Sequence, residues 1–272
     1  MDSADTAQFT AGGKRRLIVA LLEVLALFVV LELIGMSGVY RTLNRWFHHW
    51  NYAGKILWLV LPLLLILVRR RSFLVYGLAL AAGWKHVRLT LGMAAVFGLP
   101  MLVGGLFGTV RLEFDIEELW LNTLIFEVLN SFSEEVLWRG YCQSRINEVT
   151  RHRWHLCGIR FGPGLFYVAV LFGLVHAFNP FNPFRGIFTV DWTWGLVAGQ
   201  TGLLLGFVRA RTGSIYPAVF LHLWTNILGK FTDCGSVGNQ WLLLSISFTL
   251  MWTMFFVVSA IEHGSQMSKT ER

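Results

Sequence analysis

The chain has 272 residues, of which 55% are hydrophobic and 14% are charged, and its formal net charge is +7. A soluble domain carries roughly 25% charged residues, so this composition excludes an ordinary soluble protein. Nucleic-acid binding is also excluded, because the Lys and Arg residues cluster at the ends of apolar runs, where they set membrane topology and contact anionic lipids. We therefore expect an all-α, polytopic transmembrane helical bundle, formed by residues 1–272 as a single domain.

Apolar runs long enough to cross a bilayer, about 20 residues each, recur along most of the chain. They predict eight spans, at residues 17–36, 53–69, 89–110, 122–144, 162–179, 193–210, 214–230 and 240–261. The apolar segment 73–83 is too short to cross and is flanked by basic residues, which predicts an interfacial helix or a re-entrant piece. If this segment did cross, the count would become nine and the C-terminus would change sides.

The loop charges predict the orientation of the bundle. With the N-terminus inside, most basic residues fall in inner loops, whereas acidic residues gather in the outer segment 113–118. An even number of spans then places both termini in the cytoplasm. The compact chain suggests a bacterial or archaeal cytoplasmic membrane.

The fourth predicted span contains two adjacent carboxylates, Glu134 and Glu135, which point about 100° apart on a helix. Arg139 is four residues after Glu135, so these two side chains share a face and are expected to form an ion pair. This leaves Glu134 freer to act as a general base. The alternative is an ion-pair clamp between helices that does no chemistry.

Two later spans also carry polar residues. His176 follows Phe172 by one helical turn, and the aromatic ring is expected to pack beside the imidazole. His222 and Asn226 share one helix face, from which both could donate to a developing oxyanion. Each group alone could be a polar contact between helices. Polar groups from three separate spans can converge only in a buried cavity, which favours a catalytic site.

The three motifs occur in a characteristic order: Glu134-Glu135-x-x-x-Arg139, Phe172-x-x-x-His176 and His222-x-x-x-Asn226. This set resembles the CPBP family, which includes the CAAX prenyl endopeptidases and the bacteriocin-processing proteins and is also called the Abi family. The likeness extends over about residues 85–230.

The resemblance implies a glutamate-type intramembrane peptidase. By analogy, Glu134 would deprotonate the attacking water and His176 would help to position that water. His222 and Asn226 would stabilise the oxyanion, and the Glu135–Arg139 pair would orient the site. The expected partners are the lipid bilayer and a membrane-anchored protein or peptide, such as a prenylated CAAX tail, a sorting helix or a leader.

Two other functions remain open from the sequence. Glu134, His176 and His222 could bind zinc, although no closely spaced ligand pair such as HExxH anchors such a site, and we expect no metal or other cofactor. The chain could also be a membrane scaffold or immunity protein that binds a partner without cleaving it.

The predicted spans leave one problem of depth. His176 lies about 15 residues from the inner loop and Glu134 about 10, which at 1.5 Å per residue puts them at different levels. The two can meet only if one span is shifted, bent or begins deeper, and Gly162-Pro163-Gly164 could allow a late start.

Overall fold

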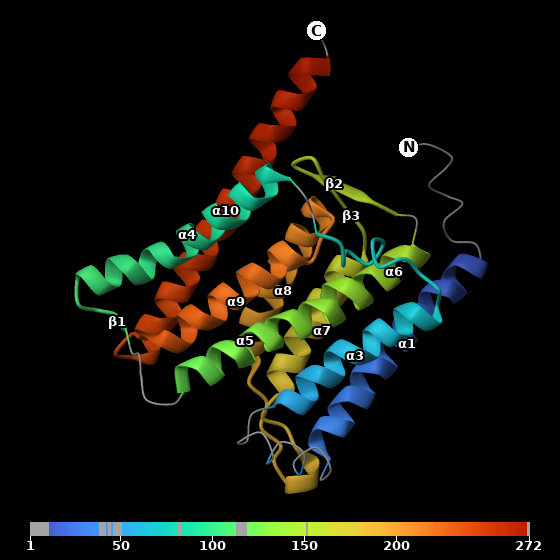
Figure 1. The fold of residues 1–272 in the computed structure, drawn as a ribbon, viewed down its shortest axis with the longest axis horizontal. Coiled ribbons are helices and arrows are strands. Elements are labelled where there is room, and N and C mark those ends of the chain that lie inside the picture. The colour runs from blue at the N-terminus through green and yellow to red at the C-terminus, as the bar shows by residue number, and fades with distance from the viewer. Residues whose placement is uncertain are drawn as a thin grey trace.

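Figure 1 shows the fold as a computed structural model, which describes residues 11–37, 42, 45, 51–80, 83–112, 119–150 and 152–270. The principal helices are α1 (Ala11–Met36), α3 (Tyr52–Val68), α4 (Trp84–Leu106), α5 (Leu119–Glu135), η2 (Val136–Cys142), α6 (Gln143–Val149), α7 (Gly164–Phe178), α8 (Trp192–Thr212), α9 (Tyr216–Phe231) and α10 (Val237–Thr270), with a short 3₁₀ turn η3 (Pro183–Arg185). Strands in the described ranges form only two short antiparallel pairs, β1 (Arg111–Leu112) with β4 (Thr232–Asp233), and β2 (Trp154–Leu156) with β3 (Ile159–Phe161). The all-α prediction is confirmed.

Each predicted span coincides with a helix, and the fourth continues without a break through α5, the π-helical η2 and α6. Within the described part of the chain, three helices are long and apolar enough to cross a membrane: Gly13–Met36, Trp84–Leu106 and Gly238–Gln266. The apolar helices Tyr52–Val68 and Gly164–Phe178 are shorter. The chain is thus an integral membrane protein. The predicted number of membrane crossings, eight, stays a prediction.

The segment between α3 and α4 differs from its prediction. Residues 73–77 form turns and no helix, and Gly77 adopts a left-handed φ of +74° that interrupts any right-handed helix. The carbonyl groups of this segment bond to the start of α9 instead: Gly77 accepts from the Ile215 amide at 2.9 Å and Ala79 from the Ser214 hydroxyl at 2.8 Å. An interfacial helix is therefore wrong for residues 73–80, and residues 81–82 lie outside the described ranges.

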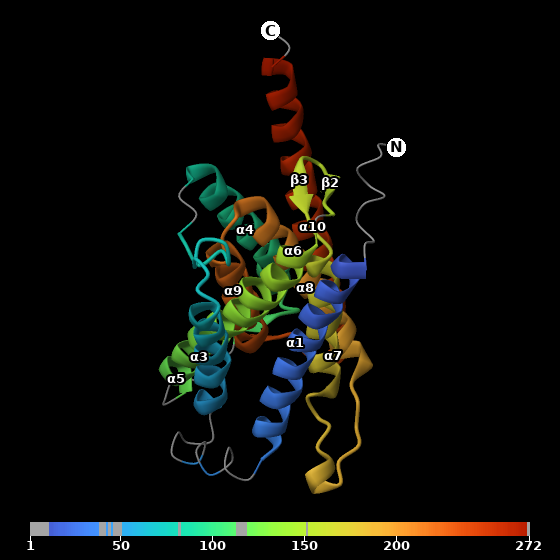
Figure 2. The same ribbon diagram turned by 90° about the vertical axis from the view of Figure 1, so that its right-hand side faces the viewer.

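Helix α1 begins and α10 ends at the same end of the bundle, the upper end in Figures 1 and 2, where the β2–β3 hairpin also lies. This placement of the two ends agrees with the prediction of an even number of spans. Which end faces the cytoplasm stays a prediction, and the acidic segment 113–118 lies outside the described residues.

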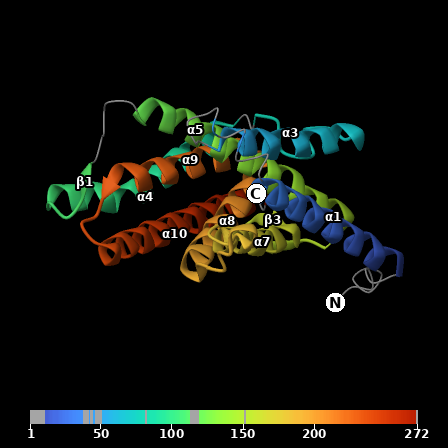
Figure 3. The ribbon, with the colours of Figure 1, turned by 90° about the horizontal axis from the view of Figure 1, so that it is seen from below.

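The centre of the bundle is built on a close contact between two helices. Seen from below, α7 and α8 lie between α1 on one side and α10 on the other, with α3 and α5 along one edge (Figure 3). A Cβ atom at Gly173 of α7 would lie 2.7 Å from the carbonyl oxygen of Gly195 of α8. Only glycine permits this approach of the two backbones.

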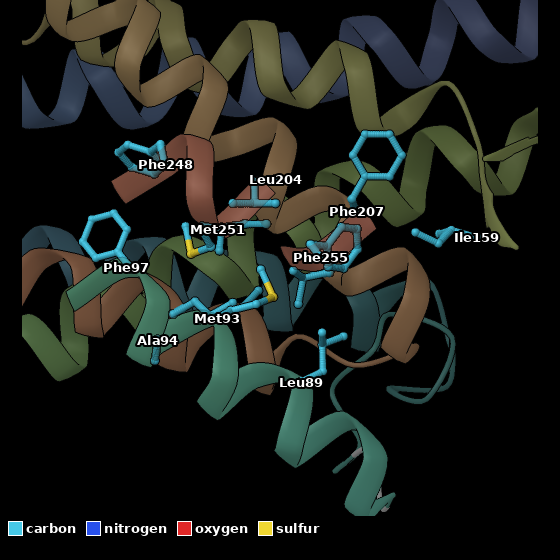
Figure 4. Packing of buried hydrophobic residues seen from close by; sticks show 14 of the residues in the cluster. Leu89, Met93, Ala94, Phe97, Ile159, Leu204, Phe207, Phe248, Met251 and Phe255 are labelled. Atoms are coloured by element: carbon cyan, nitrogen blue, oxygen red, sulfur yellow. The ribbon is translucent and has the colours of Figure 1, made fainter. Parts of the chain in front are cut away.

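Two apolar clusters flank the centre. In the first, Met93 and Phe97 of α4 pack against Phe207 of α8 and against Phe248 and Phe255 of α10 (Figure 4). The second cluster joins α1 and α3 to η2 and α7, and it includes Leu31, Ile66, Trp138, Phe172 and Val175. The polar site lies between them, because its cavity is lined by Phe97 and Phe248 from the first cluster and by Phe172 from the second.

Candidate active site

A cavity of about 510 Å³ opens among α3, α5, α7, α8 and α9, and α4 and α10 also contribute to its lining. Its lining includes all four residues expected to be catalytic, which are Glu134, His176, His222 and Asn226. The cavity therefore brings together polar groups from three separate parts of the chain.

The difference in depth between Glu134 and His176 is smaller in the structure than in the predicted spans. The fourth helix continues to Val149, 15 residues beyond Glu134, and α7 begins at Gly164, 12 residues before His176. At 1.5 Å per residue these separations are about 22 and about 18 Å, so the two side chains reach similar levels. Five extra residues on the fourth helix account for most of the change. The π-helical turns that begin at Val136 also suit a functional site, where such insertions are frequent.

Glu135 is completely buried and lies behind the cavity wall. Its Oε1 accepts from Nη1 of Arg139 at 2.8 Å and from Nδ1 of His222 at 2.9 Å. The ion pair expected from the sequence is present, and the bond to His222 is additional. Because an ionised carboxylate only accepts hydrogen bonds, Nδ1 of His222 carries a proton. His222 can then also donate from Nε2 only as the imidazolium.

The ring of Phe172 contacts both the Arg139 guanidinium group and the His176 imidazole. The Arg139 guanidinium lies 4.5 Å from the centre of its ring, and the His176 ring lies 4.3 Å from it. Gly202 of α8 makes room for this arrangement, since a Cβ there would lie 3.1 Å from Phe172 and 3.2 Å from Arg139. The expected packing of Phe172 beside His176 is observed.

His176 has a defined protonation pattern. Its Nδ1 lies 2.8 Å from the carbonyl oxygen of Phe172, which can only accept, so Nδ1 is the donor. In the neutral ring Nε2 is then the nitrogen that can accept a proton. The ring of Trp194, 5.9 Å away, packs on the imidazole from α8.

Glu134 has a cationic partner that sequence reasoning missed. Nζ of Lys55 in α3 donates to Oε1 of Glu134 at 2.6 Å and lies 4.5 Å from the ring of Trp58. The expectation of an unpaired Glu134 is wrong for this oxygen. A lysine within an apolar span is itself a costly group that indicates a buried partner, and this signal could have identified Lys55.

The second oxygen of Glu134 differs from the first. Oε2 is buried and has no hydrogen-bond donor among the residues that the structure describes. Nε2 of His222 lies 3.8 Å from it, too far for a direct hydrogen bond but a separation that one water can bridge.

Asn226 lines the cavity but bonds to a carboxylate outside the three motifs. Its Nδ2 donates to Oε2 of Glu127 at 2.9 Å, and Nδ2 of Asn130 donates to the same oxygen at 3.1 Å. Lys230 lies 3.1 Å from the other oxygen of Glu127. Because Nδ2 carries two hydrogens, Asn226 can keep this bond and still has a second donor for a substrate.

The described residues contain no group of three or more His, Cys, Asp or Glu side chains placed to hold a metal ion. In the set considered for zinc, Oε1 of Glu134 is already bonded to the Lys55 ammonium group. The expectation that the chain needs no metal stays a prediction.

Residues 116–228 match the family described as type II CAAX prenyl endopeptidase Rce1-like. This segment holds every residue of the three motifs, whereas residues 85–115 of the expected core and Lys55 lie outside it. No curated protein and no solved structure matches the chain. The matched segment carries all three motifs, and its likeness to the type II CAAX prenyl endopeptidases supports the resemblance of this segment to the CPBP family of CAAX-type proteases.

Proposed function

We propose that the chain is a glutamate-type intramembrane endopeptidase that hydrolyses a peptide bond in the tail or leader of a membrane-associated protein. The observation that carries this proposal is Oε2 of Glu134, a buried oxygen that has no donor among the described residues and lies 3.8 Å from Nε2 of His222. Oε2 of Glu135 is also without a donor among the described residues, but Glu135 does not line the cavity, whereas Glu134 borders the space that a water and a substrate could enter.

In the proposed reaction, Glu134 takes a proton from a water while the water oxygen attacks the carbonyl carbon of the scissile bond. His176, bonded through Nδ1 to the Phe172 carbonyl, accepts a hydrogen bond from the same water at Nε2 and aligns it. The C–N bond then breaks as Glu134 returns the proton to the leaving nitrogen. The products are a carboxylate and an amine.

The tetrahedral oxyanion would be stabilised by two donors on one face of α9. His222 donates from Nε2 as the imidazolium, a cation that the neighbouring carboxylate of Glu135 stabilises. Asn226 donates from the second hydrogen of Nδ2, while the first stays bonded to Glu127. Glu135 and Arg139 do not touch the substrate and act by holding His222 in place.

The substrate class follows from the surroundings of the cavity. The cavity opens among membrane helices, and its lining combines the polar groups with Phe97, Phe248 and other apolar side chains. A peptide bond can reach it only on a segment that is already at the membrane. Prenylated CAAX tails and unprenylated leaders are both candidates, and we expect a metal-free reaction.

The test is cleavage of membrane-anchored candidate peptides by the purified wild type and by Glu134→Gln, each with and without a chelator. Glutamine keeps the size of the side chain but cannot accept the proton, so we expect loss of cleavage. Glu262→Gln is the matched control, because it makes the same change at an ion pair with Arg211 outside the cavity. Chelation is expected to have no effect on the wild type.

Two outcomes would favour the other functions. Cleavage that chelation abolishes would support a zinc protease. Equal function of the wild type and Glu134→Gln in cells, with no cleavage by either, would support a scaffold or immunity protein.

A further inference from the structure

A second cavity, of about 690 Å³, lies where α1 begins, α3 ends and α6 ends. Five arginines line it: Arg15, Arg16, Arg69, Arg71 and Arg145. These residues are far apart in the sequence, so the fold gathers charges that would otherwise be spread over three loops.

Part of this charge is held in a fixed position by Glu23. Nη1 of Arg69 donates to Glu23 at 2.9 Å, and Nε of Arg145 donates to it at 2.9 Å. The hydroxyl of Tyr141 donates to the same carboxylate. The Arg145 side chain is only 7% exposed. These bonds fix the positions of Arg69 and Arg145, so this part of the cavity wall is pre-organised.

The cavity keeps an excess of positive charge after these pairs are counted. Glu23 and Glu148 are the carboxylates paired with its arginines, so five guanidinium groups face two negative charges. Arg15 and Arg16 are exposed, and the Arg71 side chain is 53% exposed despite its bond to Glu148. Their donors can reach a ligand that enters from water or from the membrane surface.

A guanidinium group stays charged at every physiological pH and matches phosphate oxygens with paired N–H donors. The position of the cavity, at the ends of membrane helices on the predicted inner side, is the level of lipid headgroups. We propose that this basic cavity binds a phosphate group, carried either by the headgroup of an anionic lipid or by a soluble phosphate. The bound group would join α1, α3 and α6, and so raise the thermal stability of the protein.

The experiment measures the binding of three probes to the full-length protein in detergent. The two lipid probes are used below the concentrations at which they self-associate. Dihexanoyl phosphatidic acid presents the phosphate on a lipid, inorganic phosphate presents it alone, and dihexanoylglycerol has the acyl chains without phosphate. We expect saturable binding of phosphatidic acid with a rise in melting temperature, and none for dihexanoylglycerol.

Two double variants test the location of the site. Arg15→Gln/Arg16→Gln is expected to weaken phosphatidic acid binding about tenfold or more, because it removes two of the guanidinium groups. Both side chains are exposed, so the fold should be retained. Lys85→Gln/Arg88→Gln removes the same charge from exposed positions at the start of α4, outside the cavity. This matched control is expected to change binding by less than about twofold.

Binding of both phosphatidic acid and inorganic phosphate would support a site for soluble phosphate, and binding of phosphatidic acid alone would support a lipid site. Equal losses in the two double variants would overturn the proposal in favour of diffuse surface charge. So would the absence of saturable binding, or equal binding of dihexanoylglycerol. These readouts do not depend on cleavage, so the result is independent of the proposed peptidase function.

Discussion

Two carboxylates on the helices of this bundle, the partly buried Glu23 and the buried Glu134, are held in different ways. Glu23, in the middle of α1, accepts from Arg69, Arg145 and Tyr141, so both of its oxygens are occupied. Its partners come from different helical segments. Glu23 thus acts as a clamp between helices.

Glu134 has only one of its oxygens bonded. Lys55 donates to Oε1, while Oε2 has no donor within the described residues and lies near His222 at the cavity wall. The sequence presents Glu23 and Glu134 alike, as acidic residues in apolar spans. We therefore expect chemistry at Glu134, where an unbonded oxygen lies at a cavity, and a structural role at Glu23.

The largest contrast is expected from the same substitution at these two positions. Glu134→Gln should lower kcat/KM for peptide cleavage about 10³-fold, because the proton acceptor is removed, while the melting temperature changes little. Glu23→Gln should leave kcat/KM within about twofold and lower the unfolding free energy by about 1–2 kcal/mol, because Arg69 and Arg145 lose a charged acceptor. Kinetics and thermal unfolding of both variants check this prediction. Equal losses of cleavage would show that the two carboxylates do not differ in role.

The next effect separates Glu134 from its neighbour Glu135. Glu135→Gln should lower the unfolding free energy by about 3 kcal/mol, because it leaves the fully buried Arg139 without its charged partner. Thermal unfolding in detergent measures this loss. The double variant Glu135→Gln/Arg139→Gln should recover part of the stability, since no unpaired charge remains. A further loss in the double variant would contradict the role of Glu135 as the partner of Arg139.

Much of this site could be predicted from helical periodicity. The i, i+4 spacing predicted the Glu135–Arg139 pair and the contact of Phe172 with His176, and both are present. Spacing of this kind is local, so it does not depend on how the helices are arranged. The helices of the described ranges were predictable for the same reason, because each predicted span is a mostly apolar run.

Contacts between distant segments could not be predicted in this way. Lys55 reaches Glu134 across 79 residues, and Asn226 reaches Glu127 across 99. Their geometry depends on the packing of α3 and α9 against α5. The interfacial helix, one of the two alternatives for segment 73–80, was wrong for a related reason, because carbonyl groups of this segment bond to the start of α9 instead of forming a local helix.

A smaller loss is expected at the proposed oxyanion site. Asn226→Ala should lower kcat about 10²-fold with little change in KM, because the lost hydrogen bond would form mainly in the transition state. Asn130→Ala is the matched control, since Asn130 donates to the same oxygen of Glu127 as Asn226 does. If Asn226 only positions Glu127, the two variants will lose the same activity, and the oxyanion role is then wrong.

The smallest loss is expected at Lys55, the residue that distinguishes the two oxygens of Glu134. Lys55→Gln keeps a donor near Oε1 but removes the charge, so Glu134 should lose orientation and not its ability to accept a proton. We expect kcat to fall about tenfold, much less than in Glu134→Gln. Lys230→Gln is the control, because Lys230 pairs with Glu127 and not with Glu134. Unchanged kcat in Lys55→Gln would mean that Oε1 needs no partner. A loss as large as that of Glu134→Gln would place Lys55 in the proton transfer itself. Lys55 and Glu134 would then act as one unit, and this pair would be what differs from Glu23.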